Sequence, residues 1–297
     1  MKKLLTVLVC AAFITLSGCG NVTKEKAPLI KGEDYDYCYN NLNEHQKDLY
    51  NKILSGMYEM NKEQIYLTND PTDISENINL AYGAVTVDHP EIFWLSGEYQ
   101  ILTLSGEKFY IKVQYSIDTA MRDGQAVTLQ NRVDKIMQDT KEMTPPDKEK
   151  YFHDYLCDNV TFTNDGDSTR YTAFGALVNG KAVCEGYAKA MQLLCKTAGI
   201  NCTLIKGVSN NESHMWNTVE IYDEWYEIDV TWDDLEQDNP IYRFYNLTTT
   251  QMQKTHTRYE EINGLGSGVS LNGIKYNLNP PVCTAIEYAY KEKISKE

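Results

Sequence analysis

The sequence predicts an α+β fold, and two patterns carry the prediction. Apolar residues recur at the spacing of amphipathic helices in several segments, while other segments have the alternation of antiparallel hairpins. In the second half of the chain a helix comes first and a sheet follows it. The 297 residues, of which 42% are apolar, are enough for one large domain or two small ones.

The first half of the folded chain is predicted to contain helices and one hairpin. Pro90 ends the second helix, because proline cannot continue helical hydrogen bonding. Ser105-Gly106-Glu107 lies between two apolar runs, which is typical of a hairpin turn. Asp88 and His89 fall at an Asp-His-Pro corner and are interpreted as turn residues. The expected helices cover 42–60, 75–87, 118–142 and 147–159, and the expected hairpin covers 99–115.

The second half begins with a helix that carries two cysteines. Asn179-Gly180 is a turn signal, so the helix is expected to start soon after it. Gly199 is expected to end this helix, because glycine favours a left-handed cap. A turn at Asp223-Glu224 would then join the last two strands into an antiparallel hairpin. The strands expected after the helix cover 203–209, 216–222 and 225–232.

The N-terminus predicts export and attachment to a membrane. Residues 1–18 contain two lysines and an apolar run that is too short to span a bilayer. The run leads into Leu-Ser-Gly-Cys at 16–19, which resembles the lipobox of bacterial lipoproteins. That resemblance implies cleavage before Cys19, acylation of Cys19, and a lipid-anchored location on the cell membrane facing outside the cytoplasm. A plain secretory signal is the alternative.

The chain is acidic, which excludes one class of partner. Its net charge of −14 becomes −16 when the first 18 residues leave with their two lysines. Nucleic-acid binding needs clustered positive charge, so no nucleic-acid partner is expected. The run at 233–238 has acidic residues at alternate positions. Asn239 stands where a calcium loop needs glycine, however, so a solvated loop is expected there.

Cysteine spacing argues against a metal site. No Cys or His pair has the spacing of a zinc site, so no metal ligand is assigned. Disulfides fit a compartment outside the cytoplasm, but a chain of this length does not need them. The cysteines left after removal of the signal and acylation of Cys19 are Cys38, Cys157, Cys184, Cys195, Cys202 and Cys283.

Position along the helix separates Cys184 from Cys195. Cys184 is expected in the first turn, where free N–H groups and the helix dipole stabilise a thiolate. Cys195 is expected about three turns later, in the apolar stripe, and is interpreted as core. A thiolate needs a base, and His214 opens a predicted strand. Asp229 is a carboxylate in an apolar run, where burial is costly without a partner.

A strict ladder closed at Asp223-Glu224 does not bring the histidine and the aspartate together. Thr218 would face Asp229, which leaves His214 four residues away, roughly 13 Å by strand rise. The two side chains would share a face of the sheet without bonding. Either a bulge with strong twist closes this gap, or the register differs.

Three motifs resemble the transglutaminase-like superfamily in its bacterial secreted branch. They are GALVNGKAVCEGYAKAMQLLC, HMWN and WYEIDVTWDD, in this order, within residues 150–250. DHPEIFW and HDYL resemble stretches that accompany this core in such lipoproteins. The resemblance implies a papain-like core, in which a helix with the cysteine packs on an antiparallel sheet. It assigns the nucleophile to Cys184, the base to His214 and the orienting acid to Asp229.

The resemblance implies acyl transfer through a thioester, without a cofactor, by a peptidase, amidase or transglutaminase. The Cys184 N–H is the expected oxyanion donor, and Tyr171, Trp216 and Trp232 are candidates for substrate or oxyanion contact, although tryptophans in such strands are more often core. Phe174 stands where the family pattern has tyrosine.

The expected partner is a protein or peptide substrate, with cell-wall peptide as one option, and the oligomeric state stays open. The alternative function is an inactive module that binds envelope protein or peptidoglycan. The altered residue at 174 favours this alternative, whereas the complete Cys-His-Asp set argues against it. The expected divisions are a signal peptide at 1–18, a tether at 19–34, an α+β region at 35–144, a transglutaminase-like catalytic domain at 145–250 and an extension at 251–297.

Overall fold

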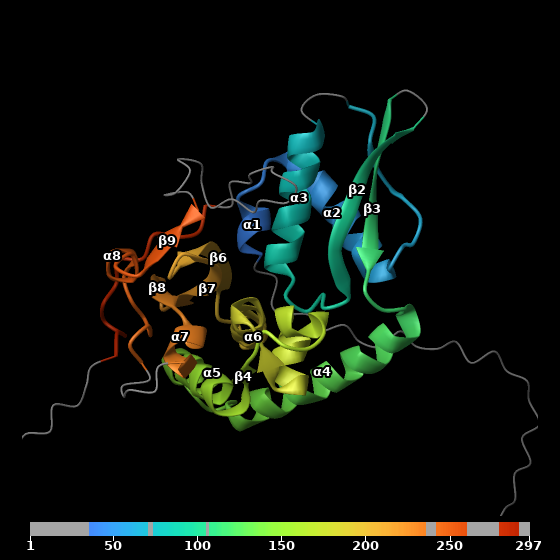
Figure 1. Cartoon of the computed structure of the whole chain (residues 1–297). Coiled ribbons are helices and arrows are strands. Elements are labelled where there is room, and N and C mark those ends of the chain that lie inside the picture. The colour runs from blue at the N-terminus through green and yellow to red at the C-terminus, as the bar shows by residue number, and fades with distance from the viewer. Residues whose placement is uncertain (1–35, 71–73, 105–106, 236–241, 260–278, 291–297) are drawn as a thin grey trace, which may run out of the picture.

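The computed structural model describes residues 36–70, 74–104, 107–235, 242–259 and 279–290. Cys19 and the predicted lipobox lie outside these ranges. Figure 1 shows an N-terminal part of helices and a hairpin beside a second part, in which one helix lies against a sheet. Within the described ranges, no helix combines the length and the apolar character that a membrane crossing requires.

The N-terminal part packs helices against an antiparallel sheet of strand order β1-β3-β2. Asn43 starts α2 with a capping box, in which the side chains of Asn43 and Gln46 each accept the other's backbone N–H. The predicted hairpin is confirmed as β2 and β3. The bounds are α1 (Tyr37–Asn40), α2 (Glu44–Glu59), β1 (Ile65–Thr68), α3 (Ile74–Asp88), β2 (Leu95–Leu104) and β3 (Lys108–Tyr115).

Two long helices, α4 (Thr119–Asp139) and α5 (Pro145–Asn159), connect the two parts. The Asp118 carboxylate caps α4 by accepting the backbone N–H of Met121 at 2.8 Å. α5 begins two residues before its predicted start, because proline fits the first helical positions, whose N–H groups have no acceptor within the helix. The short segments that follow are β4 (Thr161–Phe162), η1 (Ser168–Tyr171), η2 (Gly175–Asn179) and β5 (Lys181–Ala182).

The second part is an antiparallel sheet of strand order β8-β7-β6-β9, against which α6 packs. α6 ends as predicted, since Gly199 has a left-handed φ of 73°. The fold is therefore α+β, with a helix packed on an antiparallel sheet. The bounds are α6 (Cys184–Thr197), β6 (Cys202–Ser209), β7 (Glu212–Ile221), β8 (Glu224–Ile228), α7 (Val230–Leu235), α8 (Thr249–Met252) and β9 (His256–Arg258).

The register predicted for the β7–β8 hairpin is wrong. Ile221 pairs with Glu224, which places the turn at Tyr222-Asp223 instead of Asp223-Glu224. Both turn residues have positive φ, 51° and 66°. Two left-handed residues are typical of the turn whose twist matches that of the flanking strands. β8 also ends at Ile228, four residues earlier than predicted, because α7 follows it.

β9 lies beyond the boundary predicted at residue 250, yet it completes the sheet. It pairs antiparallel with β6, and Gly207 lies opposite Arg258. A Cβ on Gly207 would lie 2.2 Å from the Thr257 carbonyl oxygen, so the close approach of the two strands requires glycine. The boundary therefore divides the sheet, and β9 belongs with the second part.

Asp88 and His89, predicted as turn residues, lie in a buried junction between the two parts. The Asp88 carboxylate accepts the backbone N–H of Cys38 at 3.0 Å. Lys196, near the end of α6, donates to the Asp88 carbonyl and, at 2.6 Å, to the Asp36 carboxylate. Lys196 thus joins the last turn of α6 to both the first described residue, Asp36, and the end of α3.

A contiguous cluster of buried apolar side chains extends through both parts. Phe93, just before β2, stacks on Phe174, just before η2, with ring centroids 5.0 Å apart. Each large apolar side chain in such a cluster contributes about 1.5–3 kcal/mol on burial. The N-terminal part is therefore packed onto the second part and not merely tethered to it.

Gly186→Ala is predicted to destabilise the protein. Gly186 lies in α6, and an added Cβ would lie 2.4 Å from the Arg170 carbonyl oxygen and 2.8 Å from the Ala182 Cβ. These neighbours are backbone and a short side chain, so relief requires a backbone shift. We expect urea denaturation to show a loss of about 1–3 kcal/mol in the free energy of unfolding.

Gly124→Ala is the matched control. Gly124 also lies in a helix, α4, but no atom lies within 4 Å of the added Cβ. Here the loss of backbone freedom in the unfolded chain should stabilise the protein by about 0.4–1 kcal/mol. Equal effects of the two substitutions would contradict the close packing of α6 on Arg170.

Candidate functional site

Cys184 and Cys195 lie at opposite ends of α6, in different surroundings. Cys184 is the first residue of the helix and is half-buried, so its thiol lies where the helix N-terminus favours negative charge. Cys195 is fully buried, and burial raises the pKa of its thiol well above the usual value. The predicted assignment of Cys195 to the core is confirmed. All six cysteines of the described ranges are free thiols.

His214 on β7 bonds to Asp229, which directly follows β8. His214 Nε2 lies 2.6 Å from Asp229 Oδ2. The observed register explains this contact. The ladder ends at the Asn217–Ile228 pair, and one further step would set Asp229 opposite Trp216, two residues from His214 instead of four. Of the two explanations that the sequence left open, the different register is the right one, and the β7–β8 ladder is regular.

His214 and the Cys184 thiol line the same cavity, and the thiol contributes to the raised pKa of His214. Because Nε2 is used by Asp229, Nδ1 is the ring nitrogen left to face the sulfur. The structure thus brings together the three side chains to which the resemblance assigns the roles of nucleophile, base and orienting acid. They come from the start of a helix, one strand and the end of the neighbouring strand.

Asp229 accepts four hydrogen bonds. Its Oδ1 accepts the backbone N–H groups of Thr231 (3.0 Å) and Trp232 (3.2 Å), so it caps the N-terminus of α7. Its Oδ2 accepts from Nε2 of His214 and from Nε2 of His256, the latter at 2.9 Å. The side chain is almost fully buried, and these donors supply the partners that a buried carboxylate needs.

His256 is a residue of this site that the sequence did not identify. It lies on β9, is buried, and is oriented by Thr255, whose hydroxyl is 2.8 Å from Nδ1. The only signal in the sequence is the alternation of His256 and Arg258, which places both on one face of a short strand. That strand lies beyond the region of resemblance, so nothing linked it to Asp229.

The pKa values of His214 and Asp229 are shifted in opposite directions. Burial by itself lowers the pKa of His214, but the charge and hydrogen bond of Asp229, with a smaller contribution from Cys184, raise it to about 10. Burial by itself raises the pKa of Asp229, whereas the two imidazoles lower it below its usual range. At neutral pH the pair is therefore an imidazolium and a carboxylate.

Trp216 packs against the ring of His214 and does not line the cavity over the thiol. Its prediction as a substrate or oxyanion contact is therefore wrong. The Trp216 side chain is buried, its ring stacks on that of His214 with centroids 6.0 Å apart, and its Nε1 donates to Glu227 at 2.7 Å. Arg258 of β9 donates to the other oxygen of Glu227 at 2.6 Å. This buried ion pair therefore links β8 to β9 beneath the two histidines.

A cavity of about 480 Å³ opens over the thiol. Cys184 and His214 line it, together with Tyr171 and Trp232, so both of these predicted contacts stay candidates. Phe174 is buried in the core against Phe93 and does not line this cavity. The side chain at position 174 therefore serves core packing in this protein, and a hydroxyl there would not line this cavity. The first N–H groups of α6, including that of Cys184, have no acceptor within the helix and suit an oxyanion.

His214, Asp229 and His256 place three potential metal-ligand atoms within 4.8 Å of one another. Both Nε2 atoms are already bonded to the same oxygen of Asp229, and His256 is buried. Hydrogen bonding within the cluster accounts for its geometry, and we assign no metal to it.

A second Cys-His-Asp cluster, around Cys157, lacks the properties of a nucleophilic site. His153 lies between Asp154 (3.0 Å) and Asp233 (3.1 Å), and the Cys157 sulfur lies 3.9 Å from His153 Nε2. Burial raises the pKa of the Cys157 thiol. His153 is fully buried, so its contact with Asp154 is not a pair on the helix surface. The cluster joins α5 to α7.

We predict that the His214 imidazole stays protonated until the pH approaches about 10. This raised pKa contributes stability that is present in full below about 6.5, the ordinary value, and is lost as the pH rises through the folded value. Asp229→Asn should lower the pKa of His214 more than Cys184→Ala does, because the aspartate has the larger effect. Titration of the histidine ring signals by NMR measures these pKa values. A larger change in the cysteine variant would contradict the assignment of Asp229.

Comparison with known proteins gives one family for the region around this site. Residues 130–230 match the family model of the transglutaminase-like superfamily. Kyphoscoliosis peptidase of Mus musculus is 23% identical over 94 residues, which cover 26% of this chain and 14% of the mouse protein. A solved structure described as a TGase is 15% identical, with a TM-score of 0.34, over 48% of this chain and 46% of that chain.

This chain thus spans less than half the length of each of these relatives. The family match covers α5, α6, β6 and β7 and ends just after Asp229, so it includes Cys184 and His214 as well. The chain therefore contains a domain of the transglutaminase-like superfamily.

Proposed function

We propose that this protein is a cysteine-dependent acyl-transfer enzyme that acts on peptide or carboxamide bonds. The observation that carries the proposal is that His214 bonds to the Asp229 carboxylate and lines the same cavity as the Cys184 thiol. A nucleophile, a base and a group that orients the base are the parts that such chemistry needs. The cavity over the thiol provides room for a peptide segment.

In the proposed acylation step, Cys184 acts as the nucleophile and the His214 imidazolium acts as the proton donor. The Cys184 thiolate attacks the carbonyl carbon, and backbone N–H groups at the start of α6 stabilise the resulting oxyanion. The His214 imidazolium gives its proton to the leaving amine or ammonia as the C–N bond breaks, which leaves a thioester on Cys184. Asp229 holds the ring so that the other nitrogen faces the reaction.

Deacylation returns the enzyme to its starting state. Water or a primary amine attacks the thioester carbon and gives a proton to His214. The C–S bond breaks and the thiolate leaves, so that the imidazolium and thiolate are restored. Attack by water makes the enzyme a peptidase or amidase, whereas attack by an amine makes it a transglutaminase. The nature of the acceptor distinguishes these two activities.

The proposal includes the compartment. The apolar run of residues 1–18 and the lipobox-like sequence before Cys19 support export and lipid attachment. The enzyme then faces outside the cytoplasm and meets envelope proteins or cell-wall peptides as substrates.

Iodoacetamide labelling tests the proposed nucleophile. Cys184 should react fastest, and its rate should fall in His214→Ala, because the activated thiolate depends on the imidazolium. Cys157 is the matched control, since it is half-buried and also lies beside a histidine. Mass spectrometry against pH reports which cysteine is modified. Labelling of Cys184 no faster than that of Cys157 would leave the inactive binding module as the better explanation.

Activity assays then separate the reactions. Release of ammonia or of a new amino terminus indicates hydrolysis, and incorporation of a primary amine into a glutamine-containing protein indicates transfer. Cys184→Ala should abolish either activity. His214→Ala should lower kcat by about 10³-fold or more, in line with the loss of a triad member.

His256 is predicted to be a positioning residue that acts through Asp229. His256→Phe removes one of the two donors to Asp229 Oδ2, and we expect kcat/KM to fall about tenfold or more, with a shifted pH profile. His256→Gln keeps an N–H at a similar place and should recover most of the activity. Equal losses in both variants, with an unchanged pH profile, would show that only packing matters at this position.

A further inference from the structure

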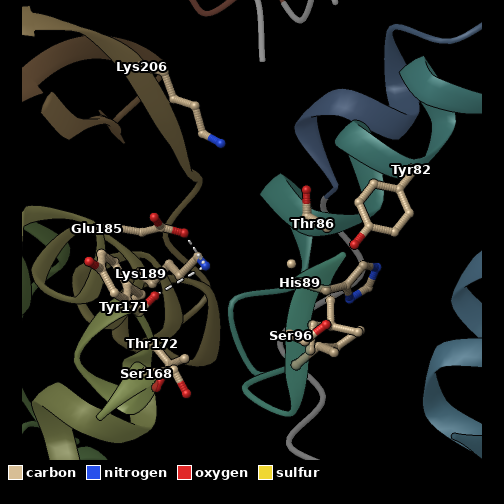
Figure 2. Close-up of a pocket in the computed structure, with 13 residues that line it drawn as sticks. Tyr82, Thr86, His89, Ser96, Ser168, Tyr171, Thr172, Glu185, Lys189 and Lys206 are labelled. Carbon is tan, nitrogen blue, oxygen red and sulfur yellow. Dashed lines mark hydrogen bonds and ion pairs between the residues drawn. The ribbon is translucent and has the colours of Figure 1, made fainter. Parts of the chain in front are cut away.

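A second cavity, of about 250 Å³, lies between the N-terminal part and the transglutaminase-like part. One wall comes from α3, β2 and the segment between them, and the other from η1, α6 and β6 (Figure 2). Neither part of the chain forms this cavity alone. Its lining differs from that of a dry core, because hydroxyl groups and charged side chains from both walls reach it.

The charges in this cavity do not balance. Lys189 is paired with Glu185, whose Oε1 lies 2.6 Å from Lys189 Nζ. His89 is paired with Glu91 at 2.7 Å. Lys206, on β6, has no carboxylate within salt-bridge distance among the residues that the structure describes. Among the charged residues that line the cavity, Lys206 is therefore the one whose charge no described salt bridge balances.

Lys206 projects into the space between the two walls (Figure 2). Its side chain is half-buried, and burial lowers the pKa of its amine, while the more distant Glu185 only partly opposes this effect. An anion at hydrogen-bond distance would reverse the effect by favouring the charged amine. The hydroxyls of Tyr82 and Ser96 on the opposite wall can donate to the same anion, because, among the described residues, that of Tyr82 has no partner and that of Ser96 accepts only the backbone N–H of Glu98.

This cavity adjoins the cavity over the thiol. Tyr171 lines both cavities. Glu185, which lines the second cavity, is the residue directly after Cys184, which lines the first. A ligand that lies along Tyr171 can therefore occupy both cavities, with one part beside Glu185 and another beside the Cys184 thiol.

We propose that the cavity around Lys206 is a subsite for a carboxylate of the substrate, so that the enzyme prefers acyl donors with an acidic group close to the attacked carbonyl. This assignment rests on the proposed function. The carboxylate bonds to the Lys206 ammonium and to hydroxyls of the facing wall. It comes either from an acidic side chain or from the carboxyl terminus of a peptide, since both present the same group.

Protection of Lys206 from acetylation tests this site without relying on turnover. The full chain carrying Cys184→Ala is treated with acetic anhydride, and mass spectrometry measures acetylation of Lys206 and of Lys181, an exposed lysine outside the cavity. The probes are N-acetylglutamate α-amide, with a side-chain carboxylate, N-acetylglutamine, with a terminal carboxylate, and the neutral N-acetylglutamine amide. We expect one or both carboxylate probes to slow acetylation of Lys206 at least tenfold at saturation, and the neutral probe to have no effect.

The pattern of protection decides the source of the carboxylate. Protection by only the first probe assigns an acidic side chain, and protection by only the second assigns a peptide terminus. Equal protection by the neutral probe, equal protection of Lys181, or no protection by either carboxylate would overturn the proposal. In a second measurement, titration calorimetry on the same protein should show that Lys206→Met weakens the protecting probe at least tenfold, whereas Lys181→Met leaves its affinity unchanged.

The outcome is separable from that of the proposed function. A protein with protected Lys206 and an unreactive Cys184 supports the carboxylate site and contradicts the enzyme. A protein with a reactive Cys184 and unprotected Lys206 supports the enzyme and removes the subsite.

Discussion

The buried carboxylate of Asp229 is the group on which the site depends. A carboxylate without partners costs several kcal/mol in a protein interior, so its surroundings must supply donors. Here the donors come from β7, from β9 and from the first turn of α7. Two strands of the sheet, the start of a helix and the base therefore meet at the same two oxygen atoms.

The two histidines that donate to this carboxylate are held by a chain of further buried contacts. Trp216 packs against the rings of both His214 and His256, and its own N–H is held by Glu227. Glu227 is in turn neutralised by Arg258. Since a buried carboxylate that loses its partner is costly, each of these contacts depends on the next. The base is thus held by groups that never contact a substrate.

The sequence predicts the parts of this site better than their assembly. Helical periodicity and the first-turn position were enough to distinguish Cys184 from Cys195, because both depend on local pattern. The hairpin register was not predictable in the same way. Asp223 is a common turn residue, but a tyrosine with a positive φ, such as Tyr222, is unusual. The sequence pattern therefore predicts the turn one residue too late, and this error puts Asp229 too far from His214. His256 was missed because its strand is short and pairs with β6 from almost fifty residues away.

The place of β9 in the chain has a consequence for shortened forms of the protein. The nucleophile, the base and the acid all lie within residues 184–229, whereas one donor to the acid follows 27 residues later. A chain cut between these points keeps a complete set of reactive groups, but the carboxylate lacks its fourth donor and the sheet lacks its edge strand. Proteolytic removal of this short strand would therefore disturb the orientation of the base without removing any of the three reactive groups.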